Sequence, residues 1–187
     1  NTVRRLAAVL RGGQPVAAGG ISRVAERPHY PLTPAQQSFY VLQLLDESGV
    51  SYHMPGIFRL SEALDAERLE QALHRLIRID EMLRTGFEQA ETGLVQRIHD
   101  EVPFVLERLR EQQPEQALKA FTRPFALDKP PLLRAALLEN ADAQYLLLDM
   151  HHILTDGISS ALTIQRLDQL YRGEEPELPA LRYRDYA

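Results

Sequence analysis

Residues Tyr145–Ser160 read YLLLDMHHILTDGISS, and this stretch decides both the expected fold and the expected site. Its leucine-rich beginning predicts a strand in a sheet. The strand is expected to end at two adjacent histidines, His151 and His152, and an Asp156-Gly157 pair follows after three residues. Successive side chains of a strand point to opposite faces of the sheet. The two rings therefore cannot serve one purpose: one packs inward, and the other points into the space beyond the strand end.

The remainder of the chain alternates between strand and helix patterns. Thr33-Pro34-Ala35-Gln36 predicts a helix start with a capping box, and Asp65 caps a second amphipathic helix. Apolar residues at helical spacing predict helices over residues 34–46, 66–81, 114–122 and 158–170. Strands are predicted over residues 55–61, 103–109, 131–139 and 144–152, with a hairpin over 83–99. This order predicts an α/β (α+β) sandwich, in which helices flank a mostly antiparallel or mixed sheet.

Composition narrows the function classes. The chain has 187 residues, 44% of them hydrophobic and 25% charged, and a net charge of -5, which is typical of one globular domain or one lobe of a larger one. No basic face indicates nucleic acid or an anionic membrane as a partner. No apolar run approaches the ~20 residues of a membrane span. The absence of cysteine excludes disulfides and thiolate metal sites, and a cytoplasmic location is expected.

The beginning of the chain looks separate from the main domain. Residues 1–11 carry apolar side chains at helical spacing and predict one short amphipathic helix. Residues 12–28 contain three glycines beyond Gly12 and two prolines, which is the composition of a linker. The main domain is expected over residues 29–187.

The histidine pair has other readings when it is taken alone. A histidine beside an apolar strand is often a hydrogen-bonded residue of the core or of a sheet edge. A metal site is not expected, because the four remaining histidines show no ligand spacing and one carboxylate four positions after His152 is not a ligand set.

Three motifs resemble those of condensation domains of nonribosomal peptide synthetases. Residues 151–157 match HHxxxDG, and the flanking Met150 and Ser159 also fit. The stretch LTPAQQSFYVLQLL (32–45) is similar to the opening motif of the family, with Ser38 where arginine is usual and Phe39 where leucine is usual. The stretch IDEMLRTGF (79–87) resembles the motif RHExLRTxF, with Ile79 and Asp80 in place of Arg and His. The motifs occur in the family's order.

The resemblance implies a fold and a reaction. Residues 29–187 would form the N-terminal lobe of a condensation domain, a lobe of the chloramphenicol acetyltransferase type, with the second lobe absent. Residues 1–11 would be the last helix of a preceding peptidyl carrier domain. The reaction implied is attack by the amine of an acceptor aminoacyl thioester on the carbonyl of a donor aminoacyl or peptidyl thioester. Upstream and downstream carriers would deliver both on 4′-phosphopantetheine, and the domain itself would bind no cofactor.

The resemblance also assigns roles to residues. His152 is the expected catalytic group, as proton acceptor, orienter of the amine or stabiliser of the intermediate, and His151 is expected to be a scaffold held by hydrogen bonds. Asp156 would be structural, ion-paired with an arginine, and the partner would be either Arg84 or an arginine of the missing lobe. Gly157 would let backbone and substrate approach closely. Ser159 is a candidate substrate contact, although Ser159 and Ser160 also suit a cap of the following helix.

Two alternatives remain open from the sequence. The epimerisation domain of the same superfamily shares HHxxxDG, and Asp80 in place of histidine is a departure from the condensation motif. The other alternative is a catalytically incomplete lobe that only docks a carrier protein. A lone lobe would also expose apolar surface meant for its partner lobe, which favours self-association.

Overall fold

The structure is a computed structural model that describes residues 20–91 and 93–187. The helix expected over residues 1–11 and the first part of the expected linker, up to residue 19, lie outside the described residues. Residues 20–29 are described and contain no helix or strand. All of them are exposed.

Two sheets form the centre of the fold. The larger has the strand order β2-β7-β6-β5, from β2 (Gly56–Arg59), β5 (Glu107–Arg110), β6 (Leu133–Glu139) and β7 (Gln144–Met150). In it β2, β7 and β6 pair antiparallel, whereas β5 pairs parallel with β6. The smaller sheet has the order β1-β4-β3, from β1 (Tyr30–Pro31), β3 (Thr85–Ala90) and β4 (Gly93–Ile98). Mixed and antiparallel sheets confirm the predicted fold class.

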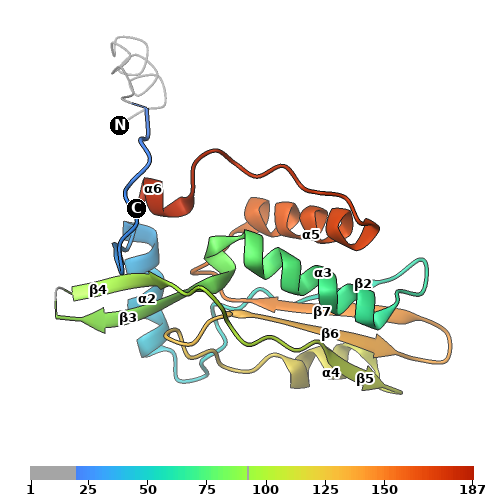
Figure 1. Cartoon of the computed structure of the whole chain (residues 1–187). Helices are drawn as coiled ribbons and strands as arrows, with labels where there is room; N and C mark the ends of the chain where they lie inside the picture. Colours follow the sequence, from blue (N-terminus) through green and yellow to red (C-terminus); the bar gives the residue numbers. More distant parts are fainter. Residues whose placement is uncertain (1–19, 92) are drawn as a thin grey trace, which may run out of the picture.

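Helices cover both faces of the larger sheet (Figure 1). Helices α3 (Ala66–Ile79) and α5 (Gly157–Arg172) pack against one another on one face, and α4 (Pro114–Phe121) covers the other. Helix α2 (Pro34–Leu45) stands beside the smaller sheet, and a short helix α6 (Tyr183–Tyr186) ends the chain close to it. The 3₁₀ helix η1 (Glu81–Arg84) joins α3 to β3. Both predicted caps are present: Thr33 forms a capping box with Gln36, and Asp65 accepts from the Arg68 N–H.

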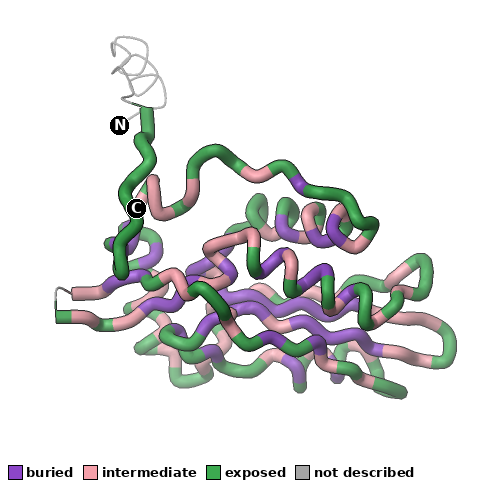
Figure 2. The backbone as a smooth tube through the Cα atoms, in the orientation of Figure 1, coloured by how far each residue is buried: buried purple, intermediate pink, exposed green. Residues whose placement is uncertain are grey.

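The alternation of β6 and β7 separates two apolar layers. Leu146, Leu148 and Met150 belong to the layer under α3 and α5, whereas Leu147 belongs to the layer under α4. Helix α3 contributes the five residues that its pattern predicts to be buried: Leu69, Ala72, Leu73, Leu76 and Ile77. Figure 2 shows the buried residues gathered along the strands and helices in the middle of the molecule. No helix of the described residues is long and apolar enough to cross a membrane.

Several predicted boundaries were wrong by a few residues. The strand expected over 103–109 pairs only from Glu107, because the Leu106 N–H donates to the Glu70 carboxylate instead of a strand partner (3.0 Å). Helix α3 ends at Ile79, because Asp80 turns the chain and accepts from the Met82 N–H at the start of η1. The strand expected to reach His152 ends at Met150.

The two layers predict a contrast between two leucines. Leu73 is fully buried in the layer under α3, whereas Leu45 is 73% exposed at the end of α2. Leu73→Ala should lower the free energy of unfolding by about 2–5 kcal/mol, because it removes packed methyl groups and leaves a cavity. Leu45→Ala, the matched control, should change it by less than about 0.5 kcal/mol. Urea unfolding of the two variants measures both, and equal losses would contradict the described core.

Candidate active site

The backbone pairing continues past the end of β7 and holds the histidine pair. His151 forms an isolated antiparallel bridge with His53. On either side of it, the His152 N–H donates to the Tyr52 carbonyl (2.8 Å) and the Met54 N–H donates to the Met150 carbonyl (2.8 Å). The segment 52–54 therefore fixes the backbone at the point where the two side chains diverge.

The His151 ring is enclosed and hydrogen-bonded at both nitrogens. Its Nε2–H donates to the Gln43 side-chain oxygen (2.8 Å), and its Nδ1 accepts from the Ile153 N–H (3.0 Å). Accepting at Nδ1 fixes the neutral tautomer with the proton on Nε2. Burial, together with the neighbouring His53 and His152, lowers the pKa of His151 from 6.5 to about 4. The ring is thus neutral at physiological pH and has no route to a substrate in this structure.

The His152 ring is half-buried and faces an open cavity of about 140 Å³. It stacks on the Phe39 ring, with 4.6 Å between centroids and 20° between planes. Its Nδ1 is enclosed without a hydrogen-bond partner in the described part of the chain, whereas Nε2 is not among the enclosed nitrogens. Nε2 is therefore the nitrogen that a reactant can reach. The cavity lies between the start of α2, the loop after β7 and the start of α5, with Tyr183 of α6 at its side.

One face of α2 contacts both histidines. Phe39 stacks on His152, and Gln43, one helical turn later, bonds His151. Residues four apart lie on the same side of a helix, so a single rigid element positions both rings. The opening motif indicated Phe39, but nothing in the sequence motifs indicated Gln43. Gln43 lies four residues after Phe39, and this helical spacing is the signal from which it could have been predicted.

Asp156 is a helix cap, and the expected ion pair with Arg84 is wrong for the described structure. The Asp156 carboxylate accepts from the Ser159 N–H (2.8 Å) at the start of α5. This backbone hydrogen bond is the main cause of the lowered pKa of Asp156. Arg84 instead donates to the carbonyls of Ile77 (3.1 Å) and His99, where it joins the end of α3 to the end of β4. Its guanidinium is occupied there and does not reach the loop.

The serines and Gly157 contribute differently from what their positions suggested. The expected cap by Ser159 or Ser160 is wrong, because Asp156 supplies the cap and Ser159 supplies only a backbone donor. The Ser160 hydroxyl bonds the Thr155 hydroxyl (3.1 Å), while Ser159 lines the cavity beside His152. A Cβ on Gly157 would meet no atom within 4 Å. The chain itself thus leaves space in front of this backbone, and its contact with a substrate stays a prediction.

A buried charged group behind His151 was not predicted from the sequence. His53 Nδ1–H donates to the Asp149 carboxylate (2.8 Å), and both side chains are fully buried. Arg134 lies 3.4 Å from the same carboxylate, and its guanidinium stacks on Phe125 at 3.7 Å from the ring centroid. The sequence signal for this group was Asp149, because a carboxylate inside an apolar strand needs a buried partner.

The described residues contain no group of three or more histidine, aspartate or glutamate side chains arranged to hold a metal ion. The site therefore consists of an accessible imidazole at the end of a strand, a fixed neutral imidazole behind it and an open cavity in front. Such an arrangement can accept, donate or orient a proton at one point.

Comparison with known proteins identifies the family. The model of the Condensation domain family matches residues 26–187, so the chain belongs to this family of nonribosomal peptide synthetase domains. The resemblance seen in the three motifs is confirmed, and the epimerisation alternative is not favoured. The chain is 44% identical over 192 residues to one of the plipastatin synthase proteins of Bacillus subtilis (strain 168) and 40% identical over 189 residues to tyrocidine synthase 2 of Brevibacillus parabrevis. Both matches cover 100% of this chain and 5% of the relative.

Solved structures agree with this assignment. The first condensation domain of the calcium-dependent antibiotic synthetase, in complex with a substrate analogue, matches with a TM-score of 0.69 and 26% identity, over 81% of this chain and 40% of that one. The X-domain from teicoplanin biosynthesis, in complex with OxyB, matches with a TM-score of 0.78 and 26% identity, over 89% of this chain and 39% of that one. The chain therefore spans well under half of these domains and a small part of the synthases.

The cap at Asp156 can be tested by two substitutions. Asp156→Ala should lower the free energy of unfolding by about 1 kcal/mol, because the first turn of α5 loses its acceptor. Asp156→Asn should retain most of the stability, since an asparagine side chain also caps. Denaturant unfolding measures both variants. A loss as large for Asn as for Ala would indicate that the charge, rather than the hydrogen bond, holds the loop.

The pKa of His151 predicts how stability depends on pH. The native ring resists protonation down to about pH 4, whereas the unfolded ring takes up a proton near pH 6.5. Between these values the unfolded state binds more protons, so this residue's contribution to stability is complete above pH 6.5 and falls as pH drops toward 4. Melting temperatures of the wild type and of His151→Asn over about pH 4–7.5 provide the measurement. The variant should show a flatter profile, and parallel profiles would contradict the assignment.

Proposed function

We propose that this chain supplies the catalytic half-site of a condensation domain that forms peptide bonds. The observation that supports the proposal is the accessible His152 ring at the end of β7, facing an open cavity while its neighbour is enclosed. The acceptor is an aminoacyl thioester and the donor is an aminoacyl or peptidyl thioester. The acceptor's α-amine attacks the donor's carbonyl carbon, a C–N bond forms, and the C–S bond breaks to release the donor's pantetheine thiol.

In this proposal Nε2 of His152 acts on the attacking amine. An α-amine with a pKa of about 8 is already partly neutral at pH 7, so its first deprotonation is a small part of the barrier. The larger contributions are a hydrogen bond that orients the amine and acceptance of its proton from the zwitterionic tetrahedral intermediate. The proton passes on to the departing thiolate. Stacking on Phe39 holds the ring in place, because Nδ1 has no hydrogen bond among the described residues to do so.

The remaining parts of the assembly follow from the family. The partners we propose are an upstream and a downstream carrier domain, which present both substrates on 4′-phosphopantetheine, and a second lobe that completes the domain. Residues 1–11 are proposed to be the last helix of the upstream carrier and residues 12–28 the linker. Exposed apolar side chains near the cavity, among them Ile158 on α5 and Tyr186 on α6, favour association with that lobe and self-association in its absence.

The proposal predicts the effect of removing one imidazole. In a synthetase that carries this chain, His152→Ala should reduce the rate of dipeptidyl thioester formation by about 10²–10⁴-fold and leave loading of the carriers unchanged. The assay follows dipeptide on the acceptor carrier by mass spectrometry. His29→Ala is the matched control, because His29 is an exposed histidine that does not line the cavity and should retain wild-type turnover.

Two outcomes would contradict the proposal. Wild-type turnover of His152→Ala would remove this ring from the mechanism. A wild-type protein that binds loaded carriers but yields no dipeptide would favour the remaining alternative, a lobe that docks carriers without catalysis.

A further inference from the structure

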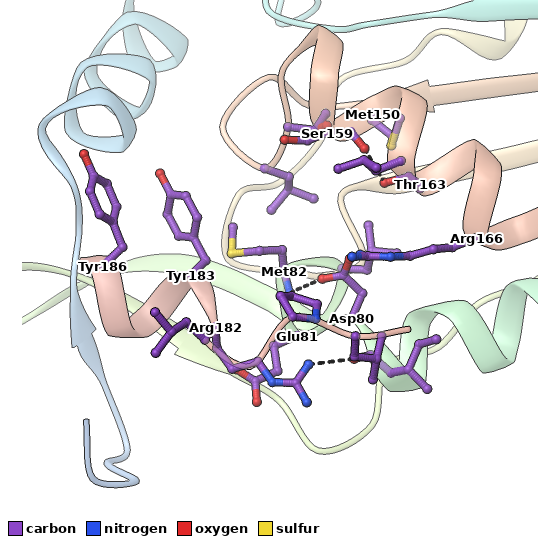
Figure 3. A pocket seen from close by; sticks show the side chains of 18 of the residues that line it. Asp80, Glu81, Met82, Met150, Ser159, Thr163, Arg166, Arg182, Tyr183 and Tyr186 are labelled. Atoms are coloured by element: carbon purple, nitrogen blue, oxygen red, sulfur yellow. Dashed lines mark hydrogen bonds and ion pairs between the residues drawn. The ribbon is translucent and has the colours of Figure 1, made fainter. Parts of the chain in front are cut away.

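A second cavity, of about 430 Å³, adjoins the one in front of His152 (Figure 3). The two share four lining residues: Leu154, Thr155, Ser159 and Tyr183. Its size lies within the range of about 300–1,000 Å³ that is typical of small-molecule sites. A molecule that reacts at His152 therefore has a neighbouring space into which a substituent can extend.

The walls of this side cavity are mostly apolar. Met150 and Leu83 belong to the core below it, Leu162 projects from α5, and Leu181 closes it from the segment that precedes α6. Figure 3 shows Met82 and Met150 on two sides of the space, with Ser159 and Thr163 of α5 along one wall. Such a lining favours an aliphatic or aromatic group over a polar one.

The charges of the lining cancel. Arg166 of α5 pairs with Asp80 in the lining, with 3.2 Å between Nη1 and Oδ2 and both side chains about one-fifth exposed. Glu81 lies 3.6 Å from Arg184, and Arg182 donates to the Ile79 carbonyl (3.4 Å). The four ionic side chains of the lining are therefore two carboxylates and two guanidiniums. A charged group that entered would lose hydration, and it would have to compete with the Asp80–Arg166 and Glu81–Arg184 pairs and with the carbonyl partner of Arg182.

Asp80 stands where the second motif of the family carries histidine, so the Asp80–Arg166 pair is a feature of this chain that the proposed reaction does not use. Asp80 also accepts from the Met82 N–H, which fixes the carboxylate at the rim of the cavity. The pair sets the polar boundary of the space, and each partner masks the charge of the other.

We propose that the side cavity binds the side chain of one of the two thioester substrates and selects an uncharged, apolar one, with the Asp80–Arg166 pair excluding charged side chains. This inference rests on the proposed function for the identity of the substrates. It adds the substrate class and the residues that determine specificity.

The test measures binding apart from reaction. Leucyl-, lysyl- and glutamyl-pantetheine amides, which cannot transfer their acyl group, are titrated by calorimetry into a synthetase that carries this chain. The wild type should bind the leucyl amide about tenfold or more tightly than either charged amide. Arg166→Gln leaves Asp80 unmasked and should shift the lysyl-to-leucyl ratio by about tenfold toward lysyl, and Asp80→Asn should shift the glutamyl ratio in the same way.

Control variants test whether the effects are specific to this cavity. Arg172→Gln removes the exposed pair with Asp168 on the same helix, outside the cavity, and should leave all ratios unchanged. Leu162→Phe places a larger side chain in the wall and reduces the free space of the cavity, so it should weaken leucyl binding even if the charge variants fail to fold. Coupling assays with the charged side chain on the donor carrier or on the acceptor carrier then show which substrate occupies the space.

The opposite results would overturn the inference. They are equal binding of the three amides by the wild type, no binding of any, ratios unchanged in both charge variants with wild-type melting temperatures, or leucyl binding indifferent to Leu162→Phe. His152→Ala should reduce coupling by about 10²–10⁴-fold, as predicted above, and preserve the binding ratios. Failure of the proposed reaction is thereby distinguished from failure of this specificity site.

Discussion

The contact between α2 and the end of β7 is the constraint on which the candidate site depends. Gln43 bonds one histidine and Phe39 stacks on the next, so the two rings are held apart by a single helix face. The capping box at Thr33 and Gln36 sets where that helix begins, and therefore which side chains reach the strand end. Phe39 stands where leucine is usual in the motif that this stretch resembles, and its aromatic ring is the group that stacks on His152.

Behind this contact lies a buried group of charges with its own requirement. His53, Asp149 and Arg134 occupy the face of the sheet opposite α3 and α5, and the carboxylate is shared between an imidazole and a guanidinium. Leaving a buried carboxylate unpaired costs several kcal/mol, and this cost holds His53 beside Asp149. Since His53 also forms the backbone bridge to His151, the buried group fixes the backbone at the end of the strand. The result is a rigid support on one side of the strand end and open space on the other.

Local patterns predicted most of the fold. The caps at Thr33 and Asp65, the buried stripe of α3 and the alternation of β7 depend on residues near one another in the chain, and these predictions were confirmed. Two of the errors arose where a group outside the local pattern took the place of the expected partner. Glu70 takes the Leu106 N–H, and Arg84 is held by two carbonyls instead of an aspartate. The motif located His152, but its surroundings come from α2, segment 52–54 and α6, which sequence spacing alone does not bring together.

The hydroxyl of Tyr183 bonds the hydroxyl of Thr33 at 3.2 Å, across 150 positions of the chain. The same tyrosine borders both cavities, and the residue that caps α2 is thereby joined to α6. During translation, α2 and both histidines leave the ribosome well before this tyrosine does. At synthesis rates of about 5–20 residues per second, the candidate site of the nascent protein lacks this tyrosine for seconds.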